Sequence, residues 1–329
     1  MSPIVKPPAD RLRTGSALPP QPGFDNAPAT PATPAATPAQ TQLDQAVADY
    51  NAARSTAQPI PLSQLTQRFK RLVPAVVQLL YPDPQHTASP RYVCQSLKNE
   101  SDSLTVWNGT DTRTSSPVVV YYYSDLSHPQ TTQLLHLCRT LQTHPHAQIV
   151  PILDSSLLPA GQLRIVCATV NGSTLQHQLT SKRPNARESA ELLIPIAQAL
   201  QHLHKLGLAH RSLCPENILI EPDSSGTFLN CLPLTSTTAY YSPEQAAGEL
   251  HRVDHRSDLF TLSVILYEML TSVRPFAGRT PTLLLQQIAQ ADAIPPRSVQ
   301  PSVPIGLQQI CLDNLQRRRT DRCLSAGAV

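Results

Sequence analysis

Hydrophobic and polar positions follow three successive patterns along the chain, and the first of them lacks apolar periodicity. Pro, Ala, Thr and Gln dominate residues 1–41, and ten of the 33 prolines fall within the first 40 residues. A segment of this composition buries too little apolar surface to offset the entropy lost on ordering. Residues 1–41 are therefore predicted to form a disordered tail, for which a spacer role is favoured over a docking role.

The second pattern is helical. Apolar residues recur at intervals of three and four over residues 42–56 and again over residues 62–73, which predicts two short amphipathic helices. The apolar face of the second is formed by Leu62, Leu65, Phe69 and Leu72. Residues 42–91 are predicted to be a helical extension, whose helices are expected to pack on the domain that follows.

The third pattern begins at residue 92, where short runs of β-branched and aromatic residues are separated by polar turns. These runs begin at Tyr92, Leu104 and Val118. Helical patterns follow at residues 131–142 and 188–206, and the segments beyond residue 245 are mostly helical. The order predicts an α+β fold with a small sheet-rich lobe followed by a larger helical lobe.

Composition and charge exclude several classes of function. Charged residues make up 15% of the chain and the formal net charge is +3, so no strong field for nucleic acid or membrane surfaces is expected. No apolar run reaches the roughly 18–20 residues that a membrane helix needs, and the first thirty residues hold no signal-peptide core. A cytoplasmic protein without membrane insertion or nucleic-acid partners is predicted.

The seven cysteines carry no signal of a metal site. They are scattered along the chain, odd in number and free of any Cys-x-x-Cys pair. Neither a zinc centre nor a disulfide framework is indicated by such a set, so ordinary reduced thiols are predicted.

One stretch of the helical half resembles a known motif. Residues 210–219 read His-Arg-Ser-Leu-Cys-Pro-Glu-Asn-Ile-Leu, which is similar to the catalytic loop of protein kinases, His-Arg-Asp-Leu-Lys-Pro-x-Asn. Further matches to the family follow its order at residues 200–210, 240–244, 256–262, 267–276 and at Arg322. The sequence of these segments most resembles that of bacterial serine/threonine kinases.

The match extends more weakly into the sheet-rich half. Residues 144–150 resemble the His-Pro-x-Ile-Val segment of the family, and residues 166–169 fall at its hinge. The resemblance covers residues 92–329 and implies the two-lobed kinase fold, with an antiparallel N-lobe at 92–170 and a helical C-lobe at 171–329.

The resemblance also implies which catalytic groups are replaced. Ser212 stands for the proton-accepting aspartate of the catalytic loop, and Cys214 stands for its lysine. A count from Asn217, the retained metal-ligand position, places Asn230 where the second ligand aspartate is expected. Phosphoryl transfer depends on a carboxylate beside the substrate and on magnesium, and magnesium prefers carboxylates to neutral amides.

The N-lobe has lost its phosphate-binding groups by the same comparison. Tyr121 occupies the position of the strand lysine, no lysine occurs between Lys98 and Lys182, and no glutamate is present on the following helix. The segment that matches the glycine-rich loop contains no glycine, and Gly109 comes too late to serve. Asp223, within a Pro- and Gly-flanked turn, is not expected to bind metal.

Other family positions are retained, and they are structural ones. The residues are His210, Arg211, Glu244, Asp258 and Arg322. They are predicted to be buried hydrogen-bond and ion-pair partners that hold the C-lobe together.

These features predict a pseudokinase, a kinase-like scaffold or allosteric partner that binds other proteins. Two alternatives stay open, a weak or atypical ATP-dependent serine/threonine kinase and a metal-independent nucleotide-binding switch. No cofactor is expected, although ATP without magnesium remains an alternative. The candidate adenine pocket is lined by Val119, Cys167, Ala168 and Leu219.

Overall fold

The computed structural model divides the chain into two units, residues 1–41 and residues 42–329. Described here are residues 91–328, without 102, 125, 159–161, 223–225 and 233–236. The tail and the helices predicted for residues 1–90, and the turn at Asp223, lie outside the described residues.

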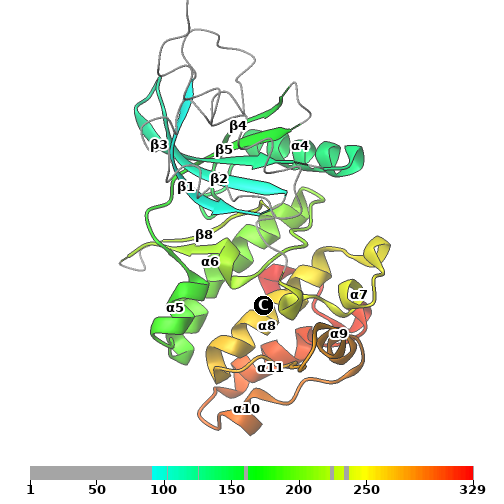
Figure 1. The fold of residues 1–329 in the computed structure, drawn as a ribbon. Coiled ribbons are helices and arrows are strands. Elements are labelled where there is room, and N and C mark those ends of the chain that lie inside the picture. The colour runs from blue at the N-terminus through cyan, green and yellow to red at the C-terminus, as the bar shows by residue number, and fades with distance from the viewer. Residues whose placement is uncertain are drawn as a thin grey trace, which may run out of the picture. The chain divides into compact units, whose positions relative to one another are not determined.

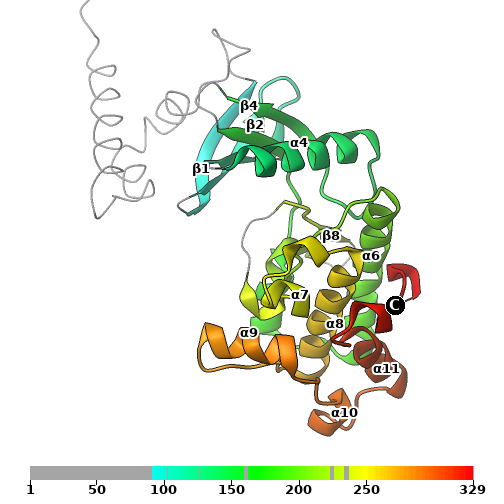
Figure 2. The same cartoon turned by 90° about the vertical axis from the view of Figure 1, so that its right-hand side faces the viewer.

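The N-lobe is built on a five-stranded antiparallel sheet with the order β1-β2-β3-β5-β4, with helix α4 along one face (Figures 1 and 2). Its elements are β1 (Tyr92–Glu100), β2 (Leu104–Asp111), β3 (Ser116–Tyr123), α4 (His128–Thr143), β4 (Ile152–Leu157) and β5 (Leu163–Ala168). Each predicted β-type run lies within a strand. Helix α4 begins earlier than predicted, because Ser127 and Gln130 form a capping box.

The C-lobe is mostly helical, as predicted. Its regular elements are β6 (Ser173–Thr174), α5 (Leu175–Ser181), α6 (Ala186–Lys205), β7 (Ile218–Ile220), β8 (Thr227–Leu229), α7 (Pro243–Ala246), α8 (His255–Thr271), α9 (Pro281–Gln290), α10 (Pro296–Val299) and α11 (Ile305–Asn314). Single 3₁₀ turns are η1 (Pro215–Asn217), η2 (Thr238–Tyr240), η3 (Leu250–Arg252), η4 (Arg319–Asp321) and η5 (Ala326–Ala328).

Helix α8 is the centre of this lobe. Fourteen of its side chains are buried, and α6 and α11 pack against it. A helix that is apolar almost all round belongs in the interior of a domain. Its N-terminus is closed by an Asp254–Ser257 capping box, which fixes where the helix starts beside the catalytic loop.

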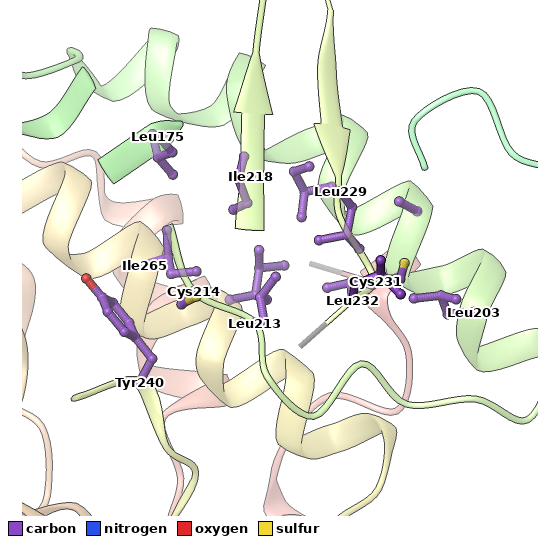
Figure 3. Packing of buried hydrophobic residues seen from close by; sticks show 14 of the residues in the cluster. Leu175, Leu203, Leu213, Cys214, Ile218, Leu229, Cys231, Leu232, Tyr240 and Ile265 are labelled. Atoms are coloured by element: carbon purple, nitrogen blue, oxygen red, sulfur yellow. The ribbon is translucent and has the colours of Figure 1, made fainter. Parts of the chain in front are cut away.

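One large apolar core continues from α4 and the sheet into the C-lobe. Leu203 of α6, Ile218 of β7 and Leu229 of β8 lie in it, together with Cys231 just after β8 (Figure 3). Ile149 forms a β-bridge with Leu229, so backbone hydrogen bonds also join the α4–β4 connection to the C-lobe. The predicted two-lobed α+β fold is confirmed. Among the described residues, no helix is both long and apolar enough to cross a membrane.

Candidate functional site

The segment between α6 and β7 is held in place by one carboxylate. Asp258 of α8 is 1% exposed and accepts hydrogen bonds from the backbone N–H groups of His210 and Arg211, both at 2.8 Å. The same carboxylate pairs with Nε2 of His204 at 2.9 Å. These bonds fix the catalytic-loop segment on the central helix, so its geometry does not depend on a ligand.

His210 continues this network toward the N-lobe. Its Nε2 lies 2.9 Å from the carbonyl oxygen of Asn230. Burial lowers the pKa of His210, although the nearby Asp258 carboxylate acts in the opposite direction. The imidazole is therefore held neutral, with Nε2 donating to the carbonyl.

Arg211 departs from the prediction. Its backbone has a left-handed conformation with φ of 65°, and its carbonyl accepts a hydrogen bond from Gln245 Nε2 at 2.7 Å. The side chain itself is exposed, so the prediction of a buried Arg211 guanidinium is wrong. The surrounding residues bind the backbone of Arg211, through Asp258 and Gln245, and not its charged side chain.

Two replaced positions of the catalytic loop carry neutral, weakly reactive groups. Ser212 is half-buried, and its hydroxyl donates over a long 3.5 Å to the carbonyl of His210. Cys214 is 1% exposed, and burial raises the pKa of its thiol to about 12, with a further contribution from Glu216. Neither side chain offers an anionic base at neutral pH, because a hydroxyl and a buried thiol both stay protonated there.

Asn217, at the end of η1, and Asn230, just after β8, are both buried and lie beside each other. The backbone N–H of Asn230 donates to the carbonyl of Asn217 at 2.8 Å. The Asn217 amide donates through Nδ2 to the Ser212 carbonyl at 2.8 Å, while its Oδ1 is buried without a hydrogen-bond partner among the described residues.

Asn230 is joined to the N-lobe through Tyr121. Its Nδ2 donates to the Tyr121 hydroxyl at 3.3 Å, and its Oδ1 accepts from the backbone N–H of Leu232 at 3.0 Å. Both side chains are buried, with 5% of Tyr121 and 2% of Asn230 exposed. Burial raises the pKa of Tyr121 far above its usual range. The two residues that the resemblance places at the family's lysine and aspartate thus form a neutral hydrogen-bonded pair.

The remaining parts of a phosphate site are absent from the described N-lobe. The face of α4 toward the sheet is formed by Leu134, Cys138 and Leu141 and carries no carboxylate. Gly109 lies opposite Cys94 within the strand pair, and a Cβ there would meet the Val93 carbonyl oxygen at 2.5 Å. This glycine therefore allows close packing of the two strands, and the expectation that it does not serve a phosphate loop stays a prediction.

The candidate adenine-pocket residues are brought into one region. Val119 and Cys167 pair across β3 and β5 and are buried in the main core. Leu219 of β7 packs against the same core from the C-lobe, and Ala168 lies half-buried at the end of β5. Their use as an adenine pocket stays a prediction.

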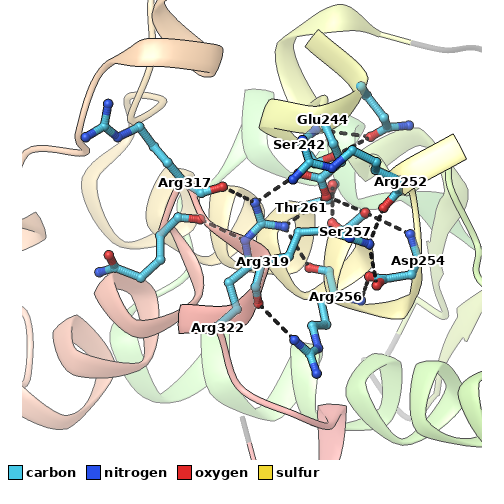
Figure 4. A network of polar contacts seen from close by, with 12 residues as sticks. Ser242, Glu244, Arg252, Asp254, Arg256, Ser257, Thr261, Arg317, Arg319 and Arg322 are labelled. Carbon is cyan, nitrogen blue, oxygen red and sulfur yellow. Dashed lines mark hydrogen bonds and ion pairs between the residues drawn. The ribbon is translucent and has the colours of Figure 1, made fainter. Parts of the chain in front are cut away.

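The structural positions of the C-lobe form a buried ion pair (Figure 4). Arg322 binds Glu244 in a bidentate manner, with Nη1–Oε1 and Nη2–Oε2 distances of 2.9 and 3.0 Å. Ser257 donates to the same carboxylate. Burial alone would raise the pKa of Glu244, but hydrogen bonds and charge from Arg322 hold it below its ordinary value.

The described residues do not fit a magnesium–triphosphate group held in the manner of the family. Both ends of the Asn230 amide are engaged within the protein, which leaves Asn217 Oδ1 as one neutral acceptor at the two ligand positions. Magnesium favours carboxylate ligands in near-octahedral geometry. No cluster of three His, Cys, Asp or Glu side chains suited to a metal ion occurs in the described part of the chain.

Sequence reasoning missed two contacts around this site. Gln245 supports the Arg211 carbonyl, and Tyr240 donates through its hydroxyl to Glu268 Oε2 at 2.7 Å. A Ser-x-x-Gln pattern at Ser242 marks Gln245 as a capping residue, but its second contact depends on tertiary structure.

Solved structures support the fold. The kinase domain of PknI from Mycobacterium tuberculosis superposes with a TM-score of 0.61 at 18% identity, covering 72% of this chain and 92% of that one. A double mutant of the same domain gives the same TM-score with 91% of its chain covered. At this identity the likeness concerns the fold alone.

Sequence relatives point the same way. A probable serine/threonine-protein kinase of Clostridium perfringens is 31% identical over 180 residues, which are 50% of this chain and 26% of that protein. Serine/threonine-protein kinase PknB of Mycobacterium tuberculosis is 31% identical over 204 residues, or 56% of this chain and 32% of the relative. The matched region is thus about a quarter to a third of these relatives' length. Residues 105–325 match the family model of the protein kinase domain, more than half of the chain, and this protein therefore belongs to the protein kinase domain family.

Proposed function

We propose that this chain is a pseudokinase that acts by binding a protein partner and does not transfer phosphate. The observation that carries the proposal is the hydrogen bond between Tyr121 and Asn230. In an active kinase these two positions supply a cation for the phosphates and a carboxylate for magnesium. Here they satisfy each other, and neither is free to perform either task.

The size of the expected loss in phosphotransfer rate favours an inactive protein over a slow kinase. Removal of one preorganised electrostatic group typically lowers a rate by about 10²–10³, and loss of a general base by roughly 10²–10⁴. Ser212, Cys214, Tyr121 and Asn230 replace four such groups together. These effects do not multiply, because residues acting as a unit are non-additive, but a family turnover of about 1–100 per second would still become undetectable.

The test is a phosphotransfer assay on the purified chain. We expect no incorporation of labelled phosphate from ATP into the chain itself or into a generic protein substrate, with either magnesium or manganese. The kinase domain of PknB serves as the positive control. Incorporation that is abolished by Asn217→Ala would overturn the proposal, because Asn217 is the retained ligand position.

A second candidate is a weak ATP-dependent serine/threonine kinase, or a metal-independent nucleotide switch. Oδ1 of Asn217 favours this candidate, because it is buried without a hydrogen-bond partner among the described residues and could accept a bond from a bound group. A thermal-shift series with ATP, with and without magnesium, separates the alternatives. Stabilisation by ATP alone supports the switch, and stabilisation that requires magnesium supports the weak kinase. No shift under any condition supports a protein-binding role alone.

A further inference from the structure

The sheet of the N-lobe buries apolar side chains on both of its faces. Strand residues alternate between faces, and in β3 Val119 and Tyr121 point to the core shared with α4, whereas Val118, Val120 and Tyr122 form a second cluster. The complete second cluster is Tyr92, Cys94, Trp107, Val118, Val120, Tyr122, Leu158 and Val166. We call the surface that it forms the outer face of the sheet.

The outer face is as well buried as the inner one. Trp107, Val120 and Val166 are each 0% exposed. Within the described part of the chain, the partly buried hydrophobic residue that packs on this cluster is Leu97 of β1, and the N-lobe helix α4 contributes its apolar residues to the other face. Side chains of the sheet alone do not cover a face that includes a tryptophan, so another segment must lie over it.

Polar contacts surround this apolar centre. Arg91 pairs with Asp111 at 3.1 Å and Arg164 with Asp154 at 3.3 Å. Both guanidinium groups lie over the Tyr92 ring, at 4.7 and 5.5 Å from its centroid. An apolar centre with a polar rim is the usual arrangement of a protein contact surface.

We propose that residues 62–80 of the same chain cover the outer face of the sheet. This segment contains the apolar face Leu62, Leu65, Phe69 and Leu72 and continues into Val-Pro-Ala-Val-Val-Gln-Leu-Leu at 73–80. A run of this kind is unfavourable in water and requires a covering surface. It is the most apolar stretch of the chain before β1. Residues 42–56 contain fewer apolar side chains, and these are spaced more widely along the sequence.

Chain length and direction fit this occupant. The chain enters β1 at Tyr92, which is itself part of the outer face and lies on the edge strand of the sheet. Eleven residues, 81–91, connect the proposed cover to that point, and eleven extended residues span roughly 36–40 Å. Five strands are only about 19 Å wide, so the segment reaches the whole face without help from a second molecule.

The consequence is that the folded domain begins near residue 62 and not at β1. The segment then belongs to the N-lobe as a structural layer and does not serve as a free linker. This inference is independent of the proposed function, because it concerns the face of the sheet opposite to the one that holds Tyr121.

Trp107 is the single tryptophan of the chain, so its fluorescence reports on this face directly. In the full-length protein, Phe69→Asp and Val76→Asp are expected to shift the emission to the red and to raise quenching by acrylamide several-fold. The matched control Val47→Asp changes an apolar residue of the other predicted helix. An equal effect from Val47→Asp, or no effect from Phe69→Asp and Val76→Asp, would overturn the assignment. Hydrogen exchange of α8 shows in each variant whether the C-lobe remains folded.

A second measurement does not depend on a destabilising change. A photoreactive benzophenone amino acid in place of Phe69 is expected to cross-link, at the mass of a monomer, to a peptide of the same chain that carries β1, β2, β3, β5 or Leu158. Cross-links at the mass of a dimer would mean that the cover comes from a second copy and would refute the proposal. An adduct on any other part of the chain, or none, would refute it as well.

Discussion

Two buried side-chain pairs occupy positions that the kinase family uses, and they differ in charge. Glu244 and Arg322, within the C-lobe, form a bidentate ion pair. Tyr121 and Asn230, between the sheet and the C-lobe, form a single neutral hydrogen bond of 3.3 Å. By the resemblance to the family, the first pair keeps the family's charges and the second replaces both of them with neutral groups.

The difference separates structural charges from catalytic ones. A buried ion pair cannot lose one member without leaving an uncompensated charge in the interior, so Glu244 and Arg322 are needed for the fold whether or not the protein reacts. The catalytic lysine and aspartate of a kinase act on phosphates and magnesium, which are not part of the fold. In this chain, Tyr121 and Asn230, the residues that the resemblance places at those two positions, form a pair without a buried charge.

The largest effect is expected where the ion pair is broken. Arg322→Ala removes a side chain that also donates to the carbonyls of Gln316, Arg256 and Arg317. We expect a loss of about 3–5 kcal/mol in the free energy of unfolding, enough to unfold many domains. Urea unfolding followed by circular dichroism measures it. A variant with wild-type stability would show that the pair does not hold the C-lobe.

A smaller effect is expected at the neutral pair. Tyr121→Phe leaves the Asn230 amide nitrogen buried without an acceptor, which typically costs roughly 1–3 kcal/mol. The matched control is Tyr92→Phe, because the Tyr92 hydroxyl is buried without a partner among the described residues. Urea unfolding of Tyr121→Phe, of Asn230→Ala and of the double variant measures the coupling between the two side chains, and Tyr92→Phe is unfolded beside them. Equal losses of unfolding free energy in Tyr121→Phe and Tyr92→Phe would show that the hydrogen bond to Asn230 does not stabilise the protein.

The two pairs also differ in predictability, because the sequence indicated the Glu244–Arg322 pair but not the bond between Tyr121 and Asn230. The strands and main helices followed from local periodicity, and Glu244 and Arg322 followed from matched motifs. The bond between Tyr121 and Asn230 joins residues 109 positions apart, and no local pattern indicates which partner a neutral amide will choose. The exposed side chain of Arg211 was missed for a related reason, because burial depends on what other segments cover.

A third effect on the free energy of unfolding is expected from His210, whose backbone N–H donates to Asp258, and this effect depends on pH. Burial lowers the pKa of His210 from 6.5 in the folded state, so the unfolded chain binds more protons near that pH. The stability contributed by neutral His210 is complete above pH 6.5 and is lost as the pH falls through its folded pKa. The loss is at most about 1.4 kcal/mol per pH unit for one proton.

Unfolding in urea between pH 8 and pH 5 tests this dependence. His210→Gln is expected to lower stability at pH 8 but to flatten the decline below pH 6.5. His128→Gln, at an exposed position of α4, provides the control and should leave the slope unchanged. A wild-type slope in His210→Gln would mean that other groups take up the protons.

The smallest effect is expected at an arginine that lies close to the buried pair but remains in solvent. Arg252 contacts Glu249 at 2.6 Å, and these side chains are 50% and 41% exposed. Solvent screens such a pair, so Arg252→Ala should change the free energy of unfolding by no more than about 0.5 kcal/mol. The urea midpoints of Arg252→Ala and Arg322→Ala, measured side by side, compare the same chemical change in water and in the interior. A loss at Arg252 approaching that at Arg322 would show that burial does not determine the effect, and the C-lobe ion pair could then not be distinguished from a surface contact.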